Sequence, residues 1–196
     1  LLELIPTAET DRAVVDYLTA FADHRLGKGV VVAKDTPNFI ANHIGIVGVV
    51  EVLRALASGK YTIEEIDAMT GPALGRPKSA TFRTMDIAGI DILAHVARNL
   101  GVELPPIVDA MVERGWIGEK AGQGFYKRVK GPAGSEIETL DPQTMTYRAK
   151  QSAKLPALDA ARSIEDTRER IKTLFAGKDK VGEFLRTTLE PTLRYI

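Results

Sequence analysis

Cysteine is absent from the 196 residues, and this absence excludes several kinds of protein. A chain without thiols has no disulfide framework, no thiolate metal site and no cysteine nucleophile. The three histidines, His24, His43 and His95, are too scattered along the sequence to form a metal cluster. We therefore expect no bound metal.

The chain also lacks an excess of charge of either sign. It carries 26 basic and 26 acidic side chains, so its formal net charge is zero. No global electrostatic field is then available to hold nucleic acid or an anionic membrane surface. We expect neither nucleic acid nor a membrane among its partners.

A long apolar run is missing too. The longest uncharged stretch lies between Asp35 and Glu51, shorter than the about 20 residues that span a bilayer. The chain begins at Leu1, with neither a methionine nor a basic leader before an apolar stretch. The sequence is therefore interpreted as a fragment of a cytoplasmic protein.

One stretch, residues 34–45, organises the rest of the chain. Thr36 can cap a helix with its hydroxyl, and Pro37 suits the first helical position, so a long helix is predicted over 37–58. Asn42 lies inside this helix among apolar residues. A buried amide costs about 1–3 kcal/mol unless its hydrogen bonds are made. Asn42 therefore has either a structural partner or a ligand, and the residues alone favour the structural partner.

The remaining periodicities predict a mainly α-helical fold. Thr10 is expected to cap a helix that ends at Gly27, with a short strand at each end. Thr62 and Glu65 have the spacing of a capping box that opens a short helix. Further helices are expected over 81–100 with a break at Gly89, 105–115, 159–175 and 179–189, and an irregular hairpin is expected over 127–150.

Two glycine-rich stretches and two aspartates are candidates for chemistry. In the loop at 71–79, Arg76 and Lys78 suit an anionic cofactor arm, although a solvated surface is the favoured interpretation. The stretch 118–127 has three glycines, but it precedes a strand, whereas a dinucleotide fingerprint follows one. It is interpreted as a structural turn.

Two aspartates, Asp86 and Asp91, lie in the helical stretch 81–100. They are five residues apart, a spacing that does not place them on one helix face, so we do not expect a catalytic pair of carboxylates. Asp91 is instead expected to cap the helix that follows Gly89.

A family resemblance rests on several of these motifs in order. The strand at 30–33 followed by Lys-Asp-Thr-Pro-Asn-Phe-Ile-Ala-Asn resembles the junction into the C-terminal domain of 3-hydroxyacyl-CoA dehydrogenases. The stretches 71–77, 86–91 and 118–126 agree with that family in the same order. Two details depart from it, because the family usually has Arg where this chain has His43, and Met-Gly-Pro at 78–80.

The resemblance implies a fold and a division of the chain. The fold is mainly α, a helical 6-phosphogluconate-dehydrogenase C-terminal-like domain with a short β-hairpin. The NAD-binding Rossmann domain is largely absent. Residues 1–33 are expected to be the tail end of the nucleotide-binding domain and a connector, residues 34–150 the helical substrate and dimerisation domain, and residues 151–196 the truncated start of a second helical region.

The resemblance also implies an activity, the NAD-dependent oxidation of 3-hydroxyacyl-CoA to 3-oxoacyl-CoA in fatty-acid β-oxidation. In the family, the residue matching Asn42 touches the substrate beside a catalytic histidine, and the residue matching Glu3 pairs with that histidine. The histidine belongs about a dozen residues before Glu3, ahead of Leu1. NAD is expected on the missing N-terminal domain, so this chain should be inactive alone. The implied partners are an acyl-CoA substrate, the chain's own nucleotide-binding domain and a second copy in a homodimer.

The rival interpretation is a non-catalytic helical dimerisation or assembly domain in which Asn42 is merely structural. Nucleotide binding by this chain is a third and less favoured hypothesis.

Overall fold

The computed structural model describes residues 1–131 and 134–196, which form two compact units, Leu1–Gly45 and Ile46–Ile196. Most of the described elements are helices, and the predicted mainly α fold is confirmed. The helices of residues 151–196 belong to the same unit as residues 46–150. The expected division at residues 33 and 150 stays a prediction about the domains of a larger protein.

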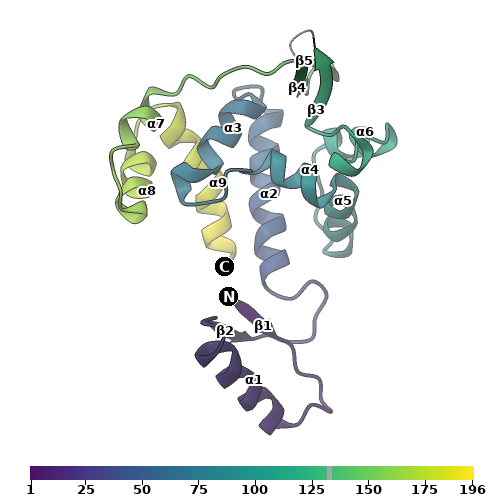
Figure 1. Ribbon diagram of the computed structural model, residues 1–196, viewed down its shortest axis with the longest axis vertical. Coiled ribbons are helices and arrows are strands. Elements are labelled where there is room, and N and C mark those ends of the chain that lie inside the picture. The colour runs from purple at the N-terminus through teal and green to yellow at the C-terminus, as the bar shows by residue number, and fades with distance from the viewer. Residues whose placement is uncertain (132–133) are drawn as a thin grey trace. The chain divides into compact units, whose positions relative to one another are not determined.

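The first unit is a small βαβ arrangement, drawn in purple in Figure 1. Strand β1 (Leu2–Leu4) pairs in parallel with β2 (Val30–Val32), and helix α1 (Arg12–His24) connects them. The predicted strand at each end of the first helix is confirmed. The predicted Thr10 cap is wrong, because Asp11 is the capping residue and its Oδ1 accepts from Ala13 N at 2.9 Å. The Thr10 hydroxyl instead accepts from Thr7 N.

Helix α2 (Ala41–Ala57) begins four residues later than predicted. Asn38 and Phe39 have φ values of 63° and 50°, in the left-handed region, so the chain at 37–40 forms a turn. A right-handed helix cannot pass through two such residues. The predicted start at Thr36 and Pro37 is therefore wrong.

The second unit contains the remaining helices. They are α3 (Ile63–Thr70), η1 (Pro72–Leu74), α4 (Phe82–Ala88), α5 (Ile90–Asn99), α6 (Pro106–Glu113), η2 (Glu119–Ala121), α7 (Pro156–Ala161), α8 (Thr167–Ala176) and α9 (Lys180–Tyr195). The predicted break between α4 and α5 is confirmed at Gly89, whose φ is 101°. Thr62 and Glu65 form a capping box at the start of α3. The helix predicted over 159–175 is instead divided into α7 and α8.

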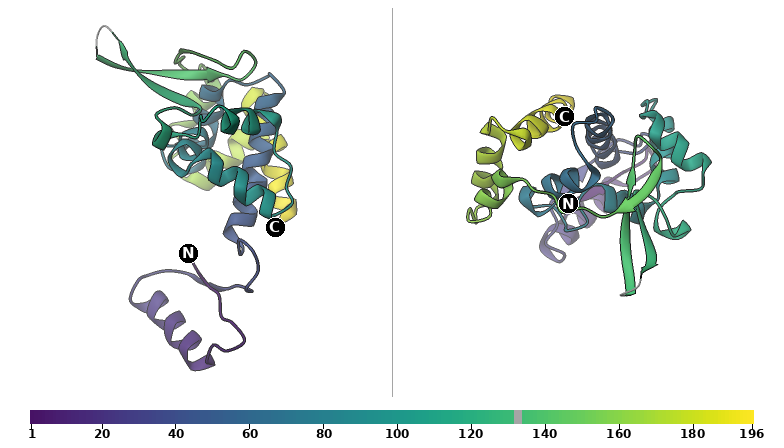
Figure 2. Two further views of the ribbon diagram at one scale, coloured as in Figure 1. Left: turned by 90° about the vertical axis from the view of Figure 1, so that its right-hand side faces the viewer. Right: turned by 90° about the horizontal axis from the view of Figure 1, so that it is seen from above.

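A three-stranded antiparallel sheet lies where an irregular hairpin was predicted. Its strands are β3 (Tyr126–Gly131), β4 (Gly134–Asp141) and β5 (Thr146–Ala149), in that order. Tyr126 lies opposite Thr139, and Leu140 lies opposite Tyr147. Figure 2 shows β3 and β4 extending as a twisted arm away from the helices. Residues 132 and 133, inside the predicted hairpin, lie outside the described residues.

The core of the second unit is built around α2. Helix α9 lies beside it (Figure 1), and a Cβ on Gly48 would lie 3.7 Å from the Thr192 side chain. This distance is an ordinary van der Waals contact, so α2 and α9 pack against each other at Gly48. The largest fully buried side chains are Leu53, Leu56, Ile63, Ile66, Met69, Phe82, Ile90, Met111, Phe125, Leu140, Phe184 and Leu185.

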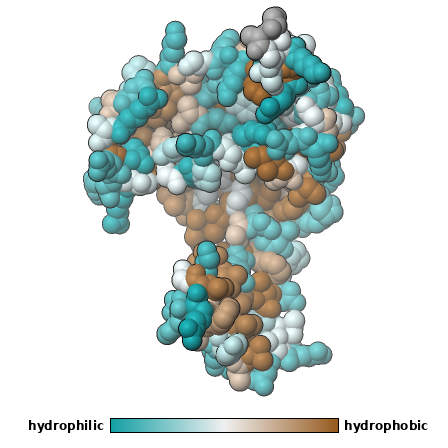
Figure 3. Space-filling model, in the orientation of Figure 1, coloured by the Kyte–Doolittle hydropathy of each residue, from teal (hydrophilic) through white to brown (hydrophobic). Residues whose placement is uncertain are grey.

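The first unit exposes a row of apolar side chains along α1. Val14, Tyr17, Leu18 and Phe21 follow helical spacing and are 41–69% exposed. Apolar surface over this unit is visible in brown in Figure 3. Within the described part of the chain, no helix is long and apolar enough to cross a membrane.

Candidate functional site

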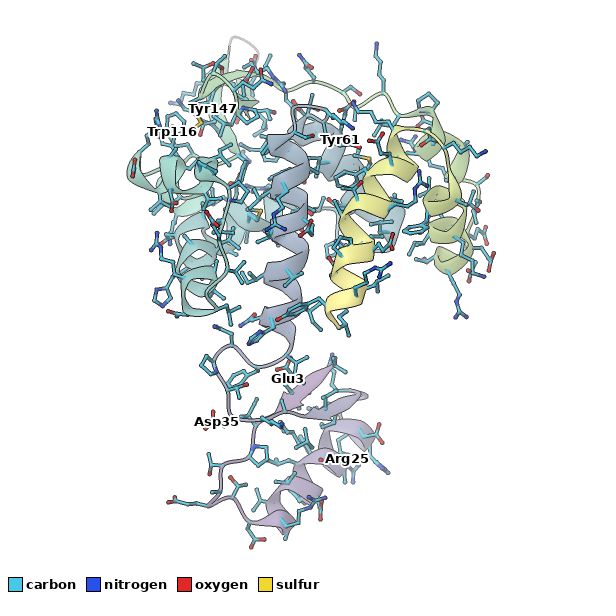
Figure 4. The ribbon with its side chains drawn as sticks, turned by 180° about the vertical axis from the view of Figure 1, so that it is seen from behind. Glu3, Arg25, Asp35, Tyr61, Trp116 and Tyr147 are labelled. Carbon is cyan, nitrogen blue, oxygen red and sulfur yellow. The ribbon has the colours of Figure 1, made fainter. Side chains whose placement is uncertain are left out.

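Glu3 lies at the N-terminus of α2, although 38 positions separate it from the helix. Its Oε1 accepts from Ala41 N at 2.7 Å, and its Oε2 accepts from Ile40 N at 3.2 Å. Figure 4 shows Glu3 on β1 beside the chain that leads into α2. The first N–H groups of a helix have no intrahelical partner, and the helix dipole favours an anion there. The Glu3 carboxylate is therefore the cap of α2.

Asn42 follows Ala41 directly, so the structure places both predicted site residues at the same end of α2. The Asn42 side chain is exposed, and it has no hydrogen-bond partner among the residues described. The expectation of a buried amide is therefore wrong. The apolar residues that suggested burial, such as Phe39 and Ile40, are themselves about 40% exposed in the turn before the helix.

The turn at 36–40 holds this arrangement in place. Phe39 N donates to Thr36 O at 3.2 Å, and His43 Nε2 donates to Pro37 O at 2.9 Å. A left-handed bulky residue such as Phe39 costs energy, and such backbone strain persists only where surrounding contacts fix it. Here it directs the Ile40 and Ala41 N–H groups at Glu3.

The first unit does not fit the phosphates of NAD. A dinucleotide lies with its pyrophosphate on the N–H groups at a helix N-terminus. In this unit Asp11 occupies that position on α1, and Glu3 occupies it on α2. Both carboxylates would repel a phosphate at these positions. Among residues 1–131 and 134–196, no group of three or more metal-binding side chains is close enough to hold an ion.

The glycine stretch at 118–124 surrounds Asp86, a buried carboxylate on α4. Asp86 Oδ1 accepts from Phe125 N at 2.8 Å, and Oδ2 accepts from Tyr126 N at 2.9 Å. A Cβ on Gly124 would lie 2.1 Å from Asp86 Oδ1. Burial raises the pKa of Asp86 to about 6, although both hydrogen bonds act to lower it. The interpretation of this stretch as a structural turn is confirmed.

Asp91 does not cap α5, so that prediction is wrong. Its Oδ2 accepts from Lys120 Nζ at 2.7 Å, and Gly89 occupies the capping position without a side-chain bond. The Lys120 ammonium competes for the carboxylate that would otherwise bond the helix N–H groups. The pair joins α5 to η2.

A hollow of about 970 Å³ in the second unit was not predicted. Its walls include Glu64 and Asp67 of α3 and Tyr126 of β3. Arg148 donates to both Glu64 oxygens, at 2.7 and 2.9 Å, and Tyr126 Oη donates to Asp67 Oδ2 at 2.7 Å. Burial acts to raise the pKa of Glu64, but hydrogen bonds from Arg148 and Gln151 N outweigh it and lower that pKa to about 2. Burial raises the pKa of Asp67.

Lys78, one of the two predicted cationic loop residues, lines this hollow, and Arg76 does not. The sequence signal for the rest was the basic run Lys127, Arg128 and Lys130 next to the glycine stretch. Such a run is usually a solvated face, so by itself it does not predict a site.

The fold and site define the class of protein to which the chain belongs, a helical dehydrogenase C-terminal domain. Residues 39–128 match the sequence family described as "3-hydroxyacyl-CoA dehydrogenase, C-terminal domain". The chain belongs to the 3-hydroxyacyl-CoA dehydrogenase family, as the motifs predicted.

Relatives across bacteria agree. The chain is 47% identical to a probable 3-hydroxyacyl-CoA dehydrogenase of Bacillus subtilis, over all of this chain and 26% of that protein. It is 49% identical to a probable 3-hydroxyacyl-CoA dehydrogenase of Deinococcus radiodurans, over 66% of this chain and 40% of that protein. The chain therefore spans between a quarter and two fifths of these relatives.

Solved structures share the fold. A crystal structure of M. tuberculosis FadB2 matches with a TM-score of 0.56 and 30% identity, over 65% of this chain and 47% of that one. A crystal structure of 3-hydroxybutyryl-CoA dehydrogenase from Escherichia coli matches with a TM-score of 0.54 and 28% identity, over 64% of this chain and 28% of that one.

Proposed function

We propose that the chain forms the substrate-side part of an NAD-dependent 3-hydroxyacyl-CoA dehydrogenase of fatty-acid β-oxidation. The overall reaction oxidises the 3-hydroxyl of an acyl-CoA thioester to a ketone, with NAD as the acceptor on a separate nucleotide-binding domain. The observation that carries the proposal is the joint position of Glu3 and Asn42 at the start of α2.

Asn42 supplies a hydrogen-bond donor that the described residues leave unused. An exposed side-chain amide without an internal partner is available to a substrate oxygen at no cost in broken protein contacts. Donation to the oxygen on C3 would fix the substrate against a general base. Fixing that oxygen is the role proposed for Asn42.

Glu3 has capacity for a second partner besides the helix. A carboxylate has about four lone-pair sites, and Ile40 N and Ala41 N occupy two of them. An imidazole N–H can take another, which would hold the base in one tautomer. Glu3 would then fix the position of the base relative to the substrate-binding end of α2, because both would be hydrogen-bonded to the same carboxylate.

The experiment replaces Asn42 in an intact enzyme that carries this segment together with a nucleotide-binding domain. We expect Asn42→Ala to lower kcat for acetoacetyl-CoA reduction by roughly 10²-fold, the typical effect of losing one oriented donor. The melting temperature should stay unchanged, because the side chain is exposed and has no partner among the described residues.

Asn99→Ala on α5 is the matched control, since Asn99 is also an exposed helical amide. It should leave kcat unchanged. An Asn42→Ala enzyme with full activity would contradict the proposal and favour the alternative, a non-catalytic helical dimerisation domain.

A further inference from the structure

The hollow in the second unit presents free positive charge. Five cationic residues line it: Lys78 after η1, Arg83 of α4, Lys127 and Arg128 on β3, and Lys150 after β5. Arg83 pairs with Glu119, and among the described residues the other four form no ion pair with a carboxylate. Lys150 lies over the Tyr126 ring, with its Nζ 5.2 Å from the ring centroid, on the face of the sheet that also carries Arg128. The Lys127 side chain lies over Tyr147 on the opposite face. The free cations of the hollow are therefore Lys78, Arg128 and Lys150.

The three acidic residues of the same lining are already engaged. Glu64 is bonded by the Arg148 guanidinium, and Glu119 pairs with Arg83. Asp67 points its oxygens at Thr81 N, Phe82 N and the Tyr126 hydroxyl. The charge that a ligand would meet in the hollow is therefore positive.

The size and the rest of the lining restrict the ligand further. A hollow of about 970 Å³ has the volume of a small-molecule site and exceeds what one inorganic anion would fill. Ala68, Pro72 and Ala153 give it a small apolar wall on which a neutral part of a ligand can lie. Cations on separate segments suit several anionic groups better than one.

We propose that this hollow binds a small molecule with two or more phosphate groups, of the chemical class of nucleotides. The nucleotide arm of coenzyme A and a free nucleotide such as ADP share this chemistry. The inference goes beyond the proposed dehydrogenase function, and its test needs no turnover, so each can fail without the other.

The test is calorimetric titration of the 196-residue chain with pyrophosphate, ADP and coenzyme A at low and at high salt. We expect saturable binding that weakens with salt, and tighter binding of ADP than of pyrophosphate because of the apolar wall. Stronger binding of coenzyme A than of ADP would assign the site to the coenzyme, and equal binding would assign it to nucleotide phosphates in general. Absence of saturable binding by all three probes at millimolar concentration would overturn the proposal.

The variant is Lys78→Gln combined with Arg128→Gln, two exposed side chains without partners among the described residues. Loss of two charge-assisted contacts should raise the Kd about tenfold or more. Lys28→Gln combined with Lys178→Gln, two exposed lysines away from the hollow, is the control that removes the same net charge. Wild-type affinity in the double variant, or an equal loss in the control, would overturn the proposal.

A second measurement does not depend on any variant. Amide chemical shifts of the wild-type chain should change on titration at residues 126–128 and 150–153, which line the hollow. Changes confined to other parts of the chain would overturn the assignment of the site.

Discussion

Glu3 is a single side chain on which the start of α2 depends. We expect Glu3→Ala to lower the free energy of unfolding by about 1–2 kcal/mol, as loss of a helix cap does, because two backbone N–H groups lose their acceptor. Faster hydrogen exchange at Ile40 and Ala41 would report the loss locally. Glu9→Ala removes an exposed carboxylate of the same unit and should change neither quantity. Unchanged exchange in the Glu3 variant would contradict the capping role.

Residue roles could be predicted from sequence where the partners are close in sequence. The capping box of Thr62 and Glu65 spans three positions, and both of its bonds are present. The cap of α2 comes from Glu3 on β1, far away in the sequence, so no local pattern reveals it, and the local pattern indicates Thr36 instead. The site residues Glu3 and Asn42 came from the family resemblance, and the exposure of Asn42 could not be read from its apolar neighbours.

At the scale of elements, the glycine turn before β3 can be tested by adding one methyl group. A Cβ on Gly118 would lie 2.2 Å from Asp86 O, and its φ is 104°. Gly118→Ala should therefore destabilise the chain by about 3 kcal/mol or more. Gly122 has a φ of 76° but no atom within 4 Å of the added Cβ, so Gly122→Ala should cost only about 1–2 kcal/mol. Equal losses in urea denaturation would contradict the close packing on Asp86.

The carboxylate that joins α4 to β3 should make stability depend on pH. The pKa of Asp86 is about 6 in the fold and 3.8 in an ordinary Asp, so between these values the folded chain keeps a proton that the unfolded chain releases. Its contribution is therefore full below about pH 4 and is lost as the pH rises through 6. Compared with Asp86→Asn, the wild type should lose up to about 3 kcal/mol between about pH 4 and 7. Urea denaturation of both proteins at several pH values measures the difference between their free energies of unfolding. A difference that does not change with pH would contradict the raised pKa.

Element positions were predictable where glycine or a repeated pattern marks them. Gly89 divides α4 from α5 as predicted, and the helix expected over 105–115 is present as α6. The start of α2 was missed because Asn38 and Phe39 adopt left-handed backbone, which Phe rarely does. The third strand, β5, was not predicted, because its four residues are too short a pattern and the strand is defined by its pairing with β4.

At the scale of the whole molecule, the proposed catalysis needs parts beyond residues 1–196. We expect the isolated chain to give no change in NADH absorbance with acetoacetyl-CoA, because both helix N-termini in the first unit carry carboxylates and do not fit NAD. Addition of a nucleotide-binding domain from a relative should restore weak activity, since the base and the cofactor would then be supplied. Turnover by the chain alone would contradict the proposal that the base and the NAD site lie on the nucleotide-binding domain.

The homodimer implied by the family resemblance stays a prediction. The apolar helix predicted over 37–58 would support it only if the chain itself left that helix uncovered. In the structure Val50, Leu53 and Leu56 of α2 are buried within the second unit itself. The exposed apolar side chains lie elsewhere, among them Ile87 on α4 and Ile92 on α5.

The long-range cap of α2 also bears on the order in which the chain folds. A helix usually nucleates where local groups satisfy its first turn, but here the acceptor lies 38 positions upstream. In the structure Glu3 is held on the paired strands β1 and β2, and the entropy of loop closure opposes its contact with α2 as long as those strands are unpaired. We infer that α2 nucleates in its apolar middle and that its first turn, with Asn42, becomes ordered only after the βαβ arrangement has formed.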